Sequence, residues 1–286
     1  MTSADANVDA KVDAAQAVDL VQREVVEDGV TLLRLNRPAR LNAITGALLV
    51  ALHRRLDEIE ADRSCRVVIL TGAGRGFCAG ADLRGGDPGV AEPFEPRPGT
   101  VGIFQLQELF SSVATRLRAL SQPVIAAVNG PATGGGLVFT LGCDIRFAAA
   151  SARFSAAFVR VGLSGSDMGT AWLLNRIVGA GRAHELMLTG RIIDAHEAQR
   201  IGLVLEAVSD DALLDRALVT ARQILANSPF GVKLTKQSMW SALEIPGLEA
   251  AINLDNRTQV LTCSTADNGE AVAAYLERRE PRWTDS

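Results

Sequence analysis

Two glycine-rich stretches carry the residue types best suited to hold a ligand through the main chain. They are 72–82 (GAGRGFCAGAD) and 129–136 (NGPATGGG), and each follows a short apolar run. Glycine lets a ligand approach the backbone closely, and the N–H groups at the start of a helix favour negative charge. The two stretches therefore indicate a site for negative charge, with plain tight turns as the alternative.

Common nucleotide-binding patterns do not fit the first stretch. Phe77 stands where the third glycine of GxGxxG should fall, and no Gly-Lys-Ser/Thr follows. The spacing of these residues alone therefore does not identify the ligand.

Asp167 lies in 162–170 (GLSGSDMGT), directly before a helix predicted at 170–178. A carboxylate at such a place can serve as the N-cap of the helix that follows.

Strands alternating with helices are expected to position these residues. A β-hairpin is predicted where Val25–Val26 and Thr31–Leu35 flank Asp28–Gly29. Apolar runs predict buried strands at 67–70, 123–129 and 145–148, and helical spacing predicts helices at 47–61, 101–120 and 134–141. This order predicts an α/β fold with a parallel sheet, in which the carboxyl ends of the strands share one edge.

The rest of the chain is predicted to be helical almost throughout. Besides 170–178, helices are expected at 181–189, 210–226, 230–243, 248–262 and 267–279, and Asp194 with Glu197 forms a capping-box pattern. The predicted division is a flexible leader (1–20), a core (21–205) and a helical C-terminal region (206–286). The segment 85–100, with four prolines and four glycines, is predicted to be a mobile loop.

Composition argues against several classes of protein. The 286 residues are 48% hydrophobic and 22% charged with a net charge of −4, and no basic patch of a nucleic-acid binder is present. The four cysteines form no CxxC pair and the three histidines are dispersed, so reduced thiols are expected rather than disulfides or a metal site. No apolar run reaches the ~20 residues of a membrane helix, and the N-terminus lacks a secretion signal. A cytoplasmic protein without a membrane span is therefore expected.

Four ordered motifs resemble those of the crotonase (enoyl-CoA hydratase/isomerase) superfamily. They are 35–43 (LNRPARLNA), 76–83 (GFCAGADL), 129–136 with 142–145 (NGPATGGG and GCDI), and 270–279 (EAVAAYLERR). The resemblance extends over about residues 22–283. It implies a spiral of repeated ββα turns and a helical C-terminal trimerisation region, with homotrimers that often pair into hexamers.

The resemblance also implies the substrate and how it is held. The substrate is an acyl-CoA thioester, so coenzyme A arrives as part of it and no separate cofactor is expected. The main-chain N–H groups of Ala81 and Gly135 are implied to form an oxyanion hole for the thioester oxygen as it becomes an enolate. Such fixed dipoles stabilise the developing charge by a few kcal/mol per donor.

Further substrate contacts follow from the same motifs. The loop Ala39–Ala43 is implied to line the pantetheine arm and the backbone of Ala79 to contact the adenine. Arg40 is either the partner of a CoA phosphate or a solvated surface residue, and Asp82 is implied to order its loop. The implied substrate-binding residues are Ala39, Arg40, Leu41, Ala43, Ala79, Gly80, Asp82, Leu83, Gly134, Val138 and Phe158.

The sequence departs from the hydratases of this family at two positions. Those enzymes carry two glutamates that hold water and transfer protons, and the corresponding residues here are Val138 and Phe158. An apolar side chain cannot transfer a proton, so the two-glutamate route is not expected. Phe158 also replaces the single base with which some relatives move a double bond from C3 to C2.

Asp167 is the carboxylate that remains nearby. Dienoyl-CoA isomerases, dihydroxynaphthoyl-CoA synthases and chlorobenzoyl-CoA dehalogenases carry a working aspartate in this segment. The resemblance therefore implies that Asp167 acts as a general base or as a nucleophile, and the N-cap role stays open beside it. We therefore expect an enzyme of the enoyl-CoA hydratase/isomerase type, a lyase or isomerase of fatty-acid or related acyl-CoA metabolism, with Ala81, Gly135 and Asp167 as catalytic groups. The alternatives are a non-catalytic acyl-CoA-binding protein and an Asp167-dependent isomerase or hydrolase.

Overall fold

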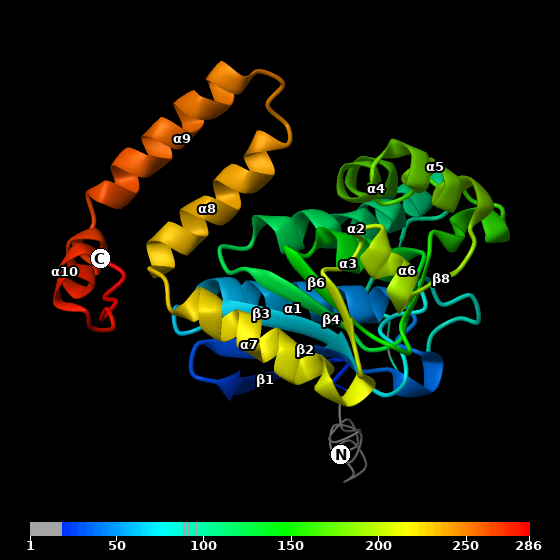
Figure 1. The fold of residues 1–286 in the computed structure, drawn as a ribbon. Coiled ribbons are helices and arrows are strands. Elements are labelled where there is room, and N and C mark those ends of the chain that lie inside the picture. The colour runs from blue at the N-terminus through cyan, green and yellow to red at the C-terminus, as the bar shows by residue number, and fades with distance from the viewer. Residues whose placement is uncertain (1–18, 88–89, 91, 95) are drawn as a thin grey trace, which may run out of the picture.

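The computed structural model describes residues 19–87, 90, 92–94 and 96–286 (Figure 1). The strands are β1 Val21–Glu27, β2 Val30–Leu35, β3 Val67–Gly72, β4 Val124–Val128, β5 Pro131–Thr133, β6 Ile145–Ala149, β7 Arg153–Ser155, β8 Ile193–Asp194 and β9 Glu206–Val208. The α-helices are α1 Gly46–Ala61, α2 Thr100–Ala119, α3 Gly135–Gly142, α4 Thr170–Val178, α5 Ala180–Thr189, α6 Ala195–Arg200, α7 Leu213–Leu225, α8 Pro229–Ala242, α9 Leu248–Cys263 and α10 Ala266–Glu277. Most of the predicted leader, and residues 88, 89, 91 and 95 of the predicted loop 85–100, lie outside the described residues.

The main sheet has the strand order β1-β2-β3-β4-β6-β9. β1 and β2 form the predicted antiparallel hairpin, which turns at Gly29 with a φ of 77°. Each later pair of neighbours in the sheet is parallel. The predicted α/β fold with a parallel sheet is therefore confirmed.

Both faces of this sheet are covered by helices. Successive side chains of a strand point to opposite faces, and all six residues of β3 are buried. Val67 and Ile69 join an apolar cluster with α7, whereas Val68 and Leu70 join the larger cluster with α1, α2 and α3. Figure 1 shows α7 along one face of the sheet. This two-sided burial explains why the strands are continuous apolar runs in the sequence.

A second sheet, in the order β5-β7-β8, accompanies the first. β4 is followed by β5 and α3, and β6 is followed by β7 and, after the 3-10 turn Ala157–Val161, by α4. Between β3 and α2 the place of the second strand is taken by Cys78, which forms a parallel bridge with Ala132 of β5. The chain therefore repeats the ββα turn expected from the resemblance.

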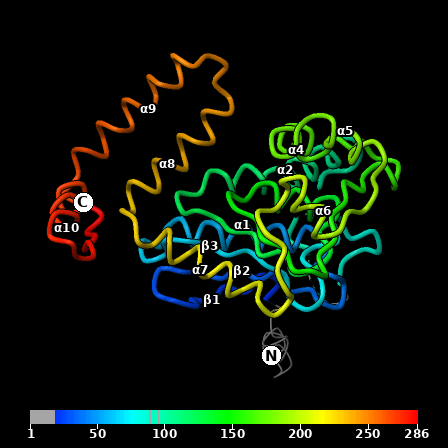
Figure 2. Tube along the Cα trace, in the orientation of Figure 1, coloured from blue at the N-terminus to red at the C-terminus, as the bar shows by residue number. Residues whose placement is uncertain are grey.

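The last three helices, α8 to α10, project from this body as a C-terminal arm (Figures 1 and 2). No residue of α9 is buried. Leu248, Val260 and Leu261 are 77%, 66% and 56% exposed. None of the helices in the described part of the chain combines the length and the apolar character that a membrane crossing needs.

The prediction for the chain after α4 omits two strands. β8 pairs with β7, and β9 pairs with β6 at the edge of the main sheet. Each is only two or three residues long, which is too short for an alternating pattern to appear in the sequence. β9 and α7, which the predicted division assigns to the helical C-terminal region, therefore pack on the main sheet.

Candidate active site

The two glycine-rich loops leave the same edge of the main sheet. β3 and β4 are parallel neighbours, and the loops 72–82 and 129–136 extend from their carboxyl ends. The Cys78 N–H donates to the Pro131 carbonyl (2.9 Å), and the Thr133 N–H donates to the Cys78 carbonyl (3.0 Å). The fold therefore joins the two loops directly, at the edge where the sequence predicts a ligand.

The N–H of Ala81 is fixed by the hydrogen bonds of its neighbours. The Gly80 carbonyl accepts the Ile44 N–H (2.8 Å), and the Asp82 N–H donates to the Ile44 carbonyl (2.9 Å). In a trans peptide the C=O and the N–H point in opposite directions, so the Ala81 N–H is directed away from Ile44. It meets no acceptor among the described residues.

Gly135 begins α3 and supplies a second N–H of this kind. The Gly134 carbonyl accepts the Val138 N–H (3.2 Å), so the N–H of the same peptide, that of Gly135, is directed out of the helix N-terminus. Gly134 has a φ of 52°, which glycine adopts without strain. A Cβ on Gly135 would lie 2.7 Å from Cδ1 of Ile44, so a side chain fits there only if Ile44 moves.

Both residues line one cavity of about 520 Å³. A Cβ placed on Gly80 would lie 3.6 Å from the Gly135 nitrogen, which shows how closely the loops approach. Two uncommitted donors at one cavity can stabilise an oxygen that gains negative charge. The predicted site residues that line this cavity are Ala79, Gly80, Ala81, Asp82, Leu83, Gly134, Gly135, Phe158 and Asp167.

Other predicted substrate-binding residues lie outside this lining, namely Ala39, Arg40, Leu41, Ala43 and Val138. Val138 is fully buried in the apolar core, so the structure does not place it at the cavity wall. The Nε atom of Arg40 lies 3.8 Å from Oδ1 of Asp87, which gives its charge a partner within the chain.

Asp167 lies in the turn before α4 and lines the same cavity. Its Oδ1 accepts hydrogen bonds from the Met168 N–H (2.7 Å) and from the side-chain amide of Gln107 on α2. Oδ2 has no hydrogen-bond partner among the described residues. The N-cap of α4 is Gly169, without a side-chain cap, so the N-cap alternative for Asp167 is wrong.

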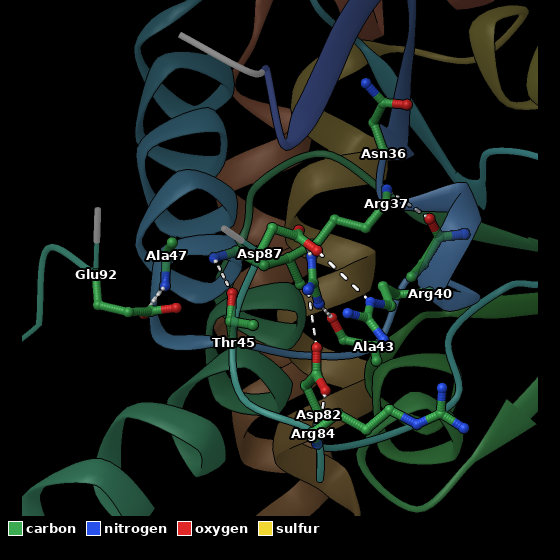
Figure 3. Close-up of polar contacts among 12 residues, drawn as sticks. Asn36, Arg37, Arg40, Ala43, Thr45, Ala47, Asp82, Arg84, Asp87 and Glu92 are labelled. Carbon is green, nitrogen blue, oxygen red and sulfur yellow. Dashed lines mark hydrogen bonds and ion pairs between the residues drawn. The ribbon is translucent and has the colours of Figure 1, made fainter. Parts of the chain in front are cut away.

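Arg37 is a buried residue at this site for which the sequence analysis predicts no role (Figure 3). Its guanidinium donates to Asp82 Oδ2 (2.8 Å), to Asp87 Oδ2 (2.6 Å) and to the Ala43 carbonyl. The side chains of Arg37 and Asp82 are only 2% and 5% exposed. Asp82 directly follows Ala81, so Arg37 holds the segment that carries the first donor and supports the implied loop-ordering role of Asp82.

The electrostatics of this cluster keep its carboxylates ionised. Burial raises the pKa of Asp82, but hydrogen bonds from Arg37 and from the Arg84 N–H, with the charge of Arg37, bring that pKa below its usual value. The hydrogen bond from Arg37 is the main cause that lowers the pKa of Asp87. These pairs join residues 45 and 50 positions apart, which explains why the sequence pattern does not reveal them.

Two further residues near the loops carry ionisable groups. Glu92 lines the cavity, and its Oε2 accepts the Ala47 N–H (2.8 Å) at the start of α1 (Figure 3). Cys78 is fully buried, and burial raises the pKa of its thiol to about 12. Since a thiol with this pKa stays protonated near neutral pH, Cys78 is a packing residue rather than a nucleophile.

Sequence comparison places the chain among acyl-CoA enzymes. The enoyl-CoA hydratase/isomerase family profile matches residues 26–286. The probable enoyl-CoA hydratase EchA12 of Mycobacterium tuberculosis is 44% identical over 269 residues, which cover 94% of each chain. The 1,2-epoxyphenylacetyl-CoA isomerase of Escherichia coli is 40% identical over 259 residues, covering 91% of this chain and 96% of that protein.

Solved structures of the same family share the fold. A probable enoyl-CoA hydratase/isomerase from Mycobacterium abscessus superposes with a TM-score of 0.83 at 37% identity, covering 93% of this chain and 99% of that one. A monofunctional enoyl-CoA isomerase from Mycobacterium smegmatis superposes with a TM-score of 0.70 at 42% identity, covering 82% and 98%. The fold is thus the α/β crotonase fold, with a sheet core and a helical C-terminal region. By sequence and by fold, the chain belongs to the enoyl-CoA hydratase/isomerase (crotonase) superfamily of acyl-CoA enzymes.

Proposed function

We propose that this enzyme stabilises the enolate of an acyl-CoA thioester between the main-chain N–H groups of Ala81 and Gly135. The observation that carries the proposal is a pair of uncommitted donors, on two hydrogen-bonded loops, that line one cavity. Negative charge moves onto the thioester oxygen as a proton leaves the neighbouring carbon. Dipoles that are already fixed stabilise that charge without reorganisation.

Asp167 is the proposed acid/base. Its carboxylate lies at the same cavity, where Gln107 and the Met168 N–H hold one oxygen and leave the other available for a proton. The proposed reaction is a proton shift within an enoyl- or dienoyl-CoA. Similar proteins bear the names of both hydratases and isomerases, and the absence of the two hydratase glutamates at Val138 and Phe158 favours isomerisation over hydration.

The physiological setting is proposed in the same way. The enzyme would act in the cytoplasm on acyl-CoA of fatty-acid or related metabolism, as a homotrimer or a dimer of trimers. Exposed apolar residues on the C-terminal arm support the assembly, because a single chain leaves them in water.

A second candidate is a protein that binds acyl-CoA without turning it over. It is favoured by one observation, the apolar residues Val138 and Phe158 at the two positions where hydratases carry glutamates. A hydrolase in which Asp167 attacks the thioester is the remaining alternative.

The decisive comparison is wild type with Asp167→Asn, assayed on crotonyl-CoA, a dienoyl-CoA and an aryl-CoA by absorbance and product chromatography. We expect turnover to fall by about 10²-fold or more, as for loss of a general acid/base. Asp215→Asn, on the exposed side of α7, is the matched control. Unchanged turnover in Asp167→Asn would contradict the proposed acid/base role of Asp167.

The same assays separate the two alternatives. Tight binding without turnover of any substrate would favour the acyl-CoA-binding protein, and an acyl group trapped on Asp167 would favour the hydrolase.

A further inference from the structure

A second cavity lies beside the cavity that the two donors line, and one residue lines both. This second cavity, of about 650 Å³, lies between α2, α4 and the connection from α8 to α9. Among the described residues, Met168 alone lines both cavities. Met168 therefore lies between the two cavities.

Met168 also packs against the proposed oxyanion hole. Its Sδ atom lies 3.3 Å from the point that a Cβ of Gly135 would occupy. Met168 is only 6% exposed, so its side chain fills the space beside the donors rather than extending into water. An acyl group whose thioester oxygen lay at Gly135 would accordingly have this thioether next to it.

The backbone of Met168 is held in a conformation that suits glycine better. Its φ is 50°, in the left-handed region that bulky residues rarely adopt. The turn is fixed by the Met168 N–H, which donates to Asp167 Oδ1 (2.7 Å), and by the Thr170 N–H, which donates to the Asp167 carbonyl (2.8 Å). A bulky residue at such a strained position indicates that its side chain has a function there.

The second cavity offers apolar and polar surface side by side. α2 runs along both cavities, since Phe110 lines the first and Ala114 the second. Arg118 pairs with Glu244 at 2.8 Å and lies over Trp172 at 4.6 Å, and Arg176 lies over the same ring at 3.8 Å. The apolar residues that line it are Ala114, Met168, Trp172, Leu173, Leu243, Ile245 and Pro246.

We propose that Met168 determines the length of acyl group that the enzyme accepts, by closing the acyl cavity toward the second one. Acyl groups that fit the first cavity end against the thioether, and removing the thioether lets unbranched chains extend across it. This inference rests on the proposed function, since it assumes that the acyl group starts at Ala81 and Gly135. Methionine is suited to such a wall because it is unbranched and adapts to irregular space.

The test measures binding and does not depend on turnover. Isothermal titration with CoA, butyryl-CoA, octanoyl-CoA and dodecanoyl-CoA gives affinity against chain length, and each newly buried methylene tightens binding by about fourfold. In the wild type we expect this gain to stop at a limiting length. In Met168→Ala we expect the limit to move to longer chains and dodecanoyl-CoA to bind at least about tenfold more tightly. CoA itself should bind equally well to both proteins.

Three further variants make the result specific. Met168→Leu keeps the side-chain volume, and Leu243→Ala enlarges the second cavity while Met168 still closes the first, so both variants should keep the wild-type limit. If Met168→Ala does not fold, Met168→Gly replaces it, because glycine adopts this φ without strain.

Two failures can be told apart. An unchanged chain-length limit in a folded Met168→Ala or Met168→Gly would overturn the role of Met168 while leaving the proposed function intact. A wild type that binds none of the CoA esters would overturn both.

Discussion

The proposed chemistry depends on two peptide groups rather than on reactive side chains. The N–H groups of Ala81 and Gly135 are oriented because the carbonyls of the same two peptides already bond to Ile44 and to Val138. Each donor is therefore fixed before a substrate arrives. Such preorganisation is what makes a backbone oxyanion hole effective.

Gly135 allows the contribution of one donor to be isolated. Gly135→Pro removes the N–H and Gly135→Ala keeps it, while both add a Cβ. The pair is best compared in an Ile44→Val background, because Cδ1 of Ile44 would lie 2.7 Å from that Cβ. We expect the proline variant to have a kcat lower than that of the alanine variant by about 10²–10³-fold, and the first position of a helix tolerates proline. Equal kcat values would show that the Gly135 N–H does not take part.

Arg37 is expected to stabilise the folded protein as well as to hold the loop that carries Ala81 and Asp82. Arg37→Met leaves the buried carboxylate of Asp82 without its cation, which costs about 3–5 kcal/mol in the free energy of unfolding. Urea denaturation at neutral pH measures this loss. Arg84→Met, an exposed arginine of the same segment, should change the value by no more than about 0.5 kcal/mol.

The effect of Arg37 is also expected to depend on pH. The pKa values of Asp82 and Asp87 are lowered in the folded protein. Their stabilisation is therefore present above the unfolded value of about 3.9 and is lost as the pH falls through the lower folded values. The difference in unfolding free energy between wild type and Arg37→Met should shrink on acidification. A difference that stays constant down to acid pH would argue against this ion cluster as the cause.

At the scale of secondary structure, prediction from the sequence succeeds where an element is long or fully buried. α1 and β3 lie within two residues of their predicted ends, because their apolar residues follow one period or form one run. The three-residue strands β5 and β7 and the short strands β8 and β9 do not show in the sequence. Their pairing is set by distant partners rather than by local pattern.

The same distinction applies to the candidate site. Glycine loops after buried strands predict where the donors lie, because glycine and a helix start are local features. Arg37, Glu92 and Met168 could not be found in this way, since each acts through residues far along the chain. Val138 shows the reverse case, because the motif implies a substrate contact whereas the side chain is buried in the apolar core.

The attachment of α8 to the core depends on a buried lysine. Lys236 is 2% exposed, and its Nζ lies 2.8 Å from Asp144 Oδ2 and donates to the carbonyls of Leu117 and Gln122 (2.9 Å each). The indole N–H of Trp240 donates to Asp144 Oδ1 (2.6 Å). One carboxylate therefore joins two turns of α8 to the main body.

Replacing this lysine should loosen the arm. Lys236→Met leaves Asp144 buried without its cation, and we expect a loss of about 3–5 kcal/mol in the free energy of unfolding. Lys233→Met, on the same helix but partly exposed, is expected to change it by about 0.5 kcal/mol or less. If thermal and urea denaturation found the two variants equally stable, the proposed anchoring role would be wrong.

At the scale of the whole molecule, the exposed apolar residues of the C-terminal arm lead us to expect that several copies of the chain assemble. Light scattering after gel filtration should give three or six times the 30.3 kDa of one chain. Aspartates at Tyr275 and Leu276, which are 84% and 74% exposed on α10, should reduce that mass, because charge opposes burial of an apolar interface. Leu188→Asp, at a 78% exposed residue of α5 outside the arm, is the control. A wild-type mass of one chain would contradict the assembly.

The most direct measurement is a crystal structure of the enzyme with acetoacetyl-CoA, an acyl-CoA that readily forms an enolate. The thioester oxygen is predicted to lie about 2.7–3.1 Å from both the Ala81 and the Gly135 nitrogen, with the acyl chain directed toward Met168. An oxygen more than about 3.5 Å from either nitrogen would contradict the proposed oxyanion hole.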